Sequence, residues 1–117
     1  MLHKVGYFKQ SYNKKLGINL PILDIYQDDG LLKHISIRHP NCLQYMSQIQ
    51  SILNSPDYIG TNPKEPDSIE LVKIFADNIQ LAIKLDKSHG YYYVATLHEI
   101  SNTKIQTRLN NGRLKNF

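Results

Sequence analysis

A strict alternation marks the segment Ile79-Gln80-Leu81-Ala82-Ile83-Lys84-Leu85-Asp86. A large aliphatic side chain stands at every second position, and smaller or polar side chains stand between them. Because successive side chains of a strand point to opposite faces, this pattern predicts a strand with one buried and one open face. The other predicted elements are placed relative to this strand.

Two further strands are predicted beside it, over residues 69–76 and 91–100. Asp77-Asn78 is a two-residue connection of the kind that hairpins favour, and residues 87–90 turn the chain again. The three strands therefore predict an antiparallel meander. Residues 4–8 and 22–26 resemble short strands, so we expect a sheet of three or four strands. Residues 1–20 are otherwise poorly defined by the sequence.

Helices are predicted mainly before this meander. Asp28-Asp29-Gly30 is typical of a helix start. A second helix would begin at Asn41 and end before Pro56, because its apolar residues recur at spacings of three and four. A short last helix follows Ser101 or Asn102. Residues 56–66 hold several prolines and predict a loop. We therefore expect an α+β domain with N-terminal helices packed on a three- to four-stranded antiparallel sheet and a short C-terminal helix.

Length and composition fit one soluble domain over residues 1–117. The hydrophobic share is 41%, the charged share is 21%, and the formal net charge is +4. No apolar run approaches the ~20 residues that span a bilayer, and no secretory signal pattern stands at the N-terminus. We therefore expect no membrane partner and a cytoplasmic location. The single cysteine, Cys42, has no partner within the chain for a disulfide.

The chemically distinctive stretch is His34-Ile35-Ser36-Ile37-Arg38-His39-Pro40. His34 and Arg38 are four residues apart, so a helix would place them on one face. Pro40 disfavours helical geometry at His39, which puts His39 at the helix C-terminus, where the dipole favours a protonated imidazole. RNA cleavage without a metal needs a base, an acid and cations around the phosphate, and these three residues supply part of that set.

Other polar residues could complete such a site. Lys84 projects from the polar face of the middle strand, and Ser101 and Thr103 follow the third strand. Thr96 and His98 share one face of the third strand, but the sequence leaves open which face. An even connection puts them on the core side with Ile83, and an odd one with a bulge puts them beside Lys84.

Each candidate also has an ordinary structural interpretation. His34 could be an exposed helix residue, and His39 could simply cap the helix. Arg38 could pair with a carboxylate, and Lys84 could be solvated surface. A zinc site is the competing chemistry, but no pair of histidines has the spacing of a metal motif. We therefore expect neither a metal nor another cofactor.

Two motifs resemble those of a known family. The segment at residues 34–40 is similar to an H-I-x-x-R-H-P pattern, and Ile52-Leu53-Asn54-Ser55-Pro56-Asp57-Tyr58-Ile59 is similar to I-L-x-x-P-D-Y-I. Followed by a meander, they resemble phage-type nuclease domains of the barnase–EndoU–colicin–RelE-like group. The resemblance covers residues 31–109. It implies an α+β fold, RNA cleavage without a metal through attack by the 2′-OH, and a phage or toxin setting.

The resulting hypothesis is a small ribonuclease, with tRNA as one candidate substrate and a cognate inhibitor protein as a candidate partner. Its expected catalytic residues are His34, Arg38, His39, Lys84, Ser101 and Thr103. In this hypothesis His34 and His39 exchange protons, and Arg38 and Lys84 hold the phosphate. Its expected RNA-binding residues are Tyr58, Lys104, Arg108 and Arg113. One alternative is a catalytically silent module of the same fold that binds RNA or protein. Another is a DNA-acting or metal-dependent phosphodiesterase, whose activity chelation would abolish.

Overall fold

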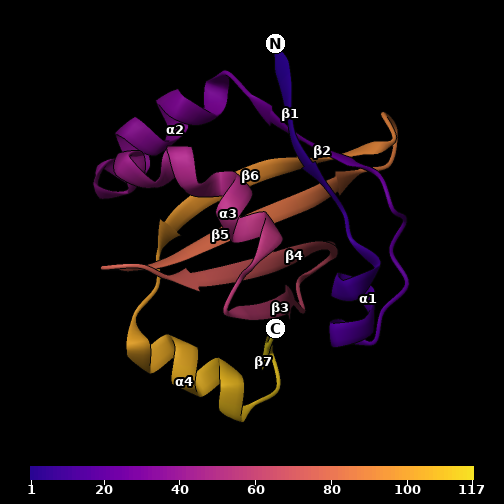
Figure 1. Cartoon of the computed structure of the whole chain (residues 1–117), viewed down its shortest axis with the longest axis vertical. Helices are drawn as coiled ribbons and strands as arrows, with labels where there is room; N and C mark the ends of the chain where they lie inside the picture. Colours follow the sequence, from indigo (N-terminus) through magenta and orange to yellow (C-terminus); the bar gives the residue numbers. More distant parts are fainter.

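The computed structural model describes residues 1–117 and is built on one seven-stranded sheet. The strand order is β1-β2-β6-β5-β4-β3-β7 (Figure 1). The strands are β1 Leu2–Tyr7, β2 Asp24–Asp28, β3 Tyr58–Asn62, β4 Glu65–Ile74, β5 Asn78–Asp86, β6 Tyr91–Glu99 and β7 Leu114–Asn116. Neighbouring strands are antiparallel except β2 and β6, which pair in parallel.

The expected sheet of three or four antiparallel strands is therefore wrong. The meander exists as β4, β5 and β6, but it is only the centre of a larger mixed sheet. The added strands are short and lie toward the edges, so they lack the long alternation that identifies a central strand. β3 and the start of β4 lie within residues 56–66, where prolines predicted a loop. The parallel pair joins β2 and β6, which are far apart in the sequence, so no local pattern predicts it.

The helices are also distributed differently from the expectation. They are α1 Gln10–Leu16, α2 Gly30–Arg38, α3 Ile49–Asn54 and α4 Asn102–Asn110, with a 3-10 helix, η1, at Pro40–Gln48. α1 lies between two strands rather than before the sheet. The helix expected from Asn41 onward is divided into η1 and α3. Its apolar stripe is still used, since Ile49 and Leu53 are both buried.

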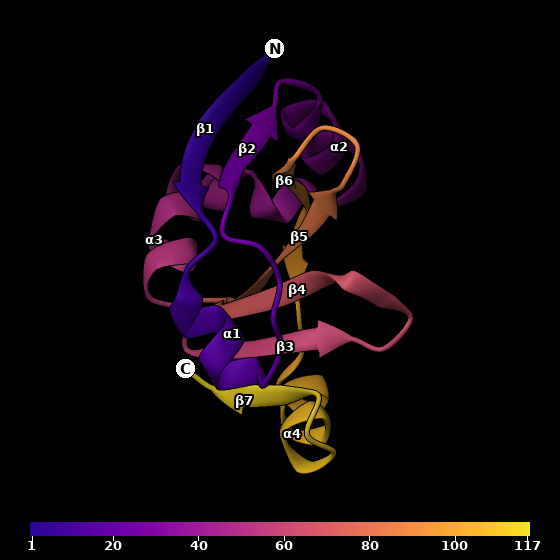
Figure 2. The ribbon, with the colours of Figure 1, turned by 90° about the vertical axis from the view of Figure 1, so that its right-hand side faces the viewer.

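One face of the sheet carries the main core. Leu71 on β4, Leu81 on β5 and Leu97 on β6 are fully buried and pack with Ile35 of α2 and Ile49 of α3. A smaller cluster lies on the opposite face, where Val72, Ile100, Ile105 and Leu114 pack α4 against one end of the sheet. In Figure 2, α3 lies on one side of the sheet, and α4 lies beside β7 at the end opposite to the N-terminus. The middle of the second face is thus left uncovered by α4.

Gly60 on β3 is required for the last strand to dock. A Cβ built at this position would overlap the backbone oxygen of Arg113 and would lie 2.8 Å from Leu114 Cδ2. Gly60 pairs with Leu114 in the β3–β7 ladder. The close approach of two backbones leaves no room for a side chain here.

We therefore predict that Gly60→Ala lowers the free energy of unfolding by about 1–3 kcal/mol, the usual cost of overpacking. Urea denaturation measures the change. Gly30→Ala is the matched control, because nothing lies within 4 Å of a Cβ at Gly30. Equal stability of Gly60→Ala and the parent would contradict this close packing.

Candidate active site

A bulge in β6 decides which residues face the open side of the sheet. Ala82 pairs with Thr96, but Ile83 pairs with Val94, so Ala95 is the extra residue. Side chains of directly paired residues lie on the same face. Thr96 and His98 therefore lie beside Ala82 and Gln80, on the same face as Lys84. The extra residue Ala95 thus places Thr96 and His98 on the same face as Lys84, which the sequence had left open.

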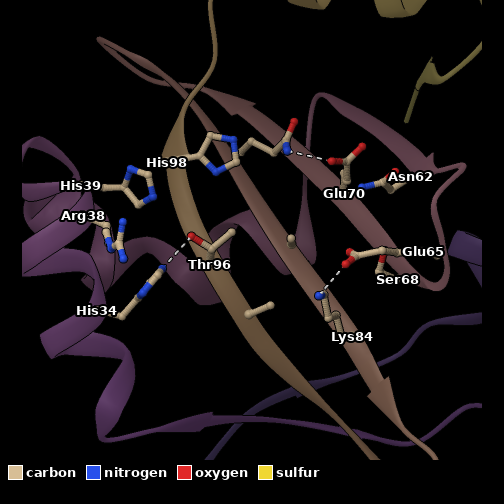
Figure 3. Close-up of a pocket in the computed structure, with 13 residues that line it drawn as sticks. His34, Arg38, His39, Asn62, Glu65, Ser68, Glu70, Lys84, Thr96 and His98 are labelled. Carbon is tan, nitrogen blue, oxygen red and sulfur yellow. Dashed lines mark hydrogen bonds and ion pairs between the residues drawn. The ribbon is translucent and has the colours of Figure 1, made fainter.

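α2 places the second group of side chains beside this face. β2 pairs with β6 only at Tyr92 and Tyr93, and α2 lies along the rest of that edge of β6 (Figure 3). Leu31 and Ile35 are buried and hold the helix against the core. The side chains of His34, Arg38 and His39 point from α2 and its C-terminus toward the strands.

Helix and strands together form an open pocket with a volume of about 760 Å³. It is lined almost wholly by polar side chains (Figure 3). The lining residues are His34, Arg38, His39, Asn62, Glu65, Ser68, Glu70, Gln80, Ala82, Lys84, Ala95, Thr96 and His98. The sequence-predicted His34, Arg38, His39 and Lys84 are thus brought together around one cavity.

Three histidines form a row along one wall of this pocket. The ring centroids of His34 and His39 are 5.9 Å apart, and those of His39 and His98 are 5.5 Å apart. His34 Nε2 lies 3.3 Å from Thr96 Oγ1, within hydrogen-bonding distance. His39 thus stands between a hydroxyl-anchored imidazole and the half-buried imidazole of His98.

The environment of His98 favours its neutral form. Burial lowers the pKa of His98 below its ordinary value of 6.5, because desolvation penalises the imidazolium. The positive charges of His39, Arg108 and Lys104 act in the same direction, and Glu70 opposes them. A neutral imidazole at neutral pH can accept a proton.

The two cations of the pocket, Lys84 and Arg38, differ in whether a carboxylate binds them. Lys84 Nζ donates to Glu65 Oε1 at 2.8 Å, and this bond raises the pKa of Lys84. Arg38 is exposed and makes no ion pair, so it is not consumed by a carboxylate. Its guanidinium is therefore available to an anionic ligand beside His39 and His98.

A buried network closes the far wall. Arg113 binds Glu70 through three contacts of 2.9–3.0 Å. Gln80 Nε2 donates to Glu70 Oε2 at 2.9 Å, and Arg108 Nη1 donates to Gln80 Oε1 at 2.8 Å. Burial lowers the pKa of Arg108. Both arginines expected to contact RNA are thus bound to groups of the pocket wall.

The remaining predicted residues lie outside the pocket. Ser101 Oγ accepts a hydrogen bond from the Lys104 backbone N–H at 3.1 Å and so caps α4. Thr103 and Lys104 are exposed on α4. Tyr58 packs against the smaller hydrophobic cluster. None of these four side chains lines the cavity that holds the histidines.

Several pocket residues were not selected from the sequence. The face of Thr96 and His98 stayed open, because the bulge at Ala95 has no signature in the alternation. Asn62 on β3 and Glu65 on β4 lie within residues 56–66, for which the prolines predict a loop. Glu70 and Gln80 lie in the expected strands, and the alternation over residues 79–86 places Gln80 on the polar face.

Neither a metal site nor a membrane span is found in this structure. No group of three or more His, Cys, Asp or Glu side chains is arranged to hold a metal ion. No helix is long and apolar enough to cross a membrane.

Comparison with known families gives a match. Residues 3–107 match the family described as phage-Barnase-EndoU-ColicinE5/D-RelE like nuclease3. The chain belongs to this family. The resemblance inferred from the two motifs is thereby confirmed, and the family supports a nuclease-type function. Searches of curated proteins and of solved structures gave no significant match.

The pocket wall provides a stability test. Glu70 has only 7% of its side chain exposed, and Arg113 is its closest cationic partner. Arg113→Ala would leave this buried carboxylate without its bidentate partner. We predict a loss of about 3 kcal/mol in the free energy of unfolding, measured by urea denaturation. Lys115→Ala removes a nearby exposed cation and should change stability by less than about 0.5 kcal/mol. Similar losses in both variants would contradict a structural role for the network.

Proposed function

We propose that this nuclease-family protein is a metal-independent endoribonuclease, with tRNA among its candidate substrates. The observation that carries the proposal is the pairing of His39 and His98 at 5.5 Å beside the unpaired guanidinium of Arg38. Two imidazoles at this separation can act on the two oxygens on opposite sides of one phosphorus. The guanidinium can bind the same phosphate through two hydrogen bonds.

The proposed reaction is an internal transesterification. His98, favoured in its neutral form, takes the proton of the ribose 2′-OH. The 2′-oxygen forms a bond to phosphorus, and the bond between phosphorus and the 5′-oxygen breaks. His39 gives a proton to the departing 5′-oxygen. The products are a 2′,3′-cyclic phosphate and a free 5′-hydroxyl, and no water or metal is consumed in this step.

The proton transfer differs from the sequence-based expectation, in which His34 and His39 exchanged protons. His34 is anchored to Thr96, and we propose that this pair positions the substrate beside the reacting phosphate. His39 lies at the C-terminus of α2, between the rings of His34 and His98, and we propose it as the proton donor. Because His39 is next to His98 in the row, the two imidazoles can act on the same phosphate.

Cations balance the charge that develops on the phosphoryl oxygens. Arg38 reaches the phosphate from the same wall as His39. Lys84 lies on the middle strand, and a substrate would have to draw its ammonium away from Glu65. Preorganised donors of this kind supply much of the rate enhancement in phosphoryl chemistry.

The competing interpretation is a silent module that binds RNA through the same pocket. It would keep the fold and the pocket but give no products. The two are separated by incubating purified protein with total RNA in EDTA and by mapping the ends produced. Cyclic phosphate ends support the proposal, and activity that disappears on chelation supports a metal-dependent phosphodiesterase.

We predict that His39→Ala lowers RNA cleavage by about 10²–10⁴-fold, the usual contribution of one general acid. Thermal denaturation should show an intact fold, because His39 is only partly buried. His89→Ala is the matched control, since His89 is exposed and pairs with Asp86 in a turn. Full activity of His39→Ala on RNA that the parent cuts would remove this residue from the mechanism.

The lowered pKa of His98 predicts the pH dependence of cleavage. The acidic limb of kcat/KM should have its midpoint below pH 6.5, because activity needs neutral His98. A midpoint above pH 6.5 would exclude His98 as the base.

Stability gives a second readout of His98. Between pH 6.5 and the lowered pKa, the unfolded chain binds a proton that the folded chain does not. The contribution of His98 to stability is therefore undiminished above pH 6.5 and falls as the pH decreases through this range. In His98→Gln this part of the pH dependence of the unfolding free energy should be absent, as urea denaturation at several pH values would show.

A further inference from the structure

A second, smaller hollow adjoins the pocket on the other side of the histidine pair. It has a volume of about 270 Å³, against about 760 Å³ for the pocket. The residues that line both cavities are Arg38, His39 and His98. Two imidazoles and one guanidinium thus separate two cavities and border both.

These three residues are the ones placed at the scissile phosphate above. A phosphodiester bound between them has one nucleoside on each side. The cavities on either side are therefore in position for the two nucleosides. Lys84 and His34 border only the larger cavity, which suits the nucleoside that carries the 2′-OH and the strand leading to it.

The smaller hollow has a different chemical character. Besides the three shared residues, it is lined by Pro40, Asn41, Cys42 and Glu99. It holds no second cation, so nothing in it favours another phosphate. Its polar groups are an exposed amide and an exposed carboxylate, which can hydrogen-bond to the edge of a base. Pro40 provides an apolar surface next to them.

The chain direction connects this hollow to His39. Pro40 and Asn41 directly follow the imidazole that donates the proton to the 5′-oxygen. A leaving nucleoside that receives this proton would lie over these residues, at the start of η1. We propose that the hollow formed by Pro40, Asn41 and Glu99 binds the nucleoside on the leaving side of the cleaved bond. This inference rests on the proposed ribonuclease function.

Asn41→Trp tests the assignment, because an indole would fill the hollow. Asn41 is exposed, and its side chain makes no hydrogen bond within the chain, so the fold should tolerate the change. Two substrate-like probes separate the two sides. A ribodinucleotide that the parent cleaves occupies both cavities, and the matching 3′-nucleotide occupies only the phosphate site and the larger pocket.

We expect Asn41→Trp to lower kcat/KM for the dinucleotide by about tenfold or more. The inhibition constant of the 3′-nucleotide should stay within about twofold of the parent value. Ser47→Trp is the matched control, because Ser47 is an exposed residue of η1 outside both cavities, and it should change neither quantity.

The outcomes distinguish failure of the leaving-side site from failure of the ribonuclease proposal. Unchanged dinucleotide cleavage by Asn41→Trp overturns the leaving-side site and leaves the ribonuclease proposal standing. An equal loss in dinucleotide cleavage and in 3′-nucleotide binding also overturns it, because the tryptophan would then act on the shared phosphate site. Failure of the parent and of Ser47→Trp to cleave any dinucleotide or RNA in EDTA overturns both proposals.

Discussion

One extra residue in β6, Ala95, determines the chemistry of the open sheet face. Tyr91 and Tyr93 pair with Asp86 and Lys84, so they lie on that face. Without the bulge, the alternation would continue through residues 95 and 97, and His98 would point into the core. With it, Leu97 is fully buried and His98 reaches the pocket. The bulge thus lets β6 bury Leu97 on one face and present His98 on the other. Bulges near active sites commonly redirect a side chain in this way.

Charge pairing then decides which groups remain available to a ligand. Glu70 is neutralised by Arg113, and Lys84 is held by Glu65. Arg38 has no such partner and stands where α2 ends, beside the histidines. The cavity therefore contains two carboxylates, Glu65 and Glu70, yet its one unpaired cation lies next to the imidazole row. The free positive charge of the cavity is thus concentrated at this point rather than spread over the pocket.

The sequence predicted the central meander and the grouping of His34, Arg38 and His39, because both depend on local periodicity and spacing. It could not predict the mixed seven-stranded sheet, since the parallel pairing of β2 with β6 and the docking of β7 on β3 are non-local. The position of His98 in the site could not be predicted either. Its face depends on one unpaired residue, and a period-two pattern cannot show where a strand gains a residue. Arg108 and Arg113 looked like free cations because their partner, Glu70, is distant in sequence.

The pocket wall links this non-local packing to the site. Arg108 and Arg113 lie beyond residues 3–107, which the family match covers, yet they fix Glu70 and Gln80 in the cavity. Arg113 directly precedes β7, which approaches β3 closely at Gly60, where no side chain intervenes. Gln80 pairs with His98 across the two strands, so the network of Arg113, Glu70 and Gln80 lies directly beside the proposed base. The histidines supply the proposed acid–base chemistry, and two arginines from the last ten residues of the chain bind the polar wall beside them.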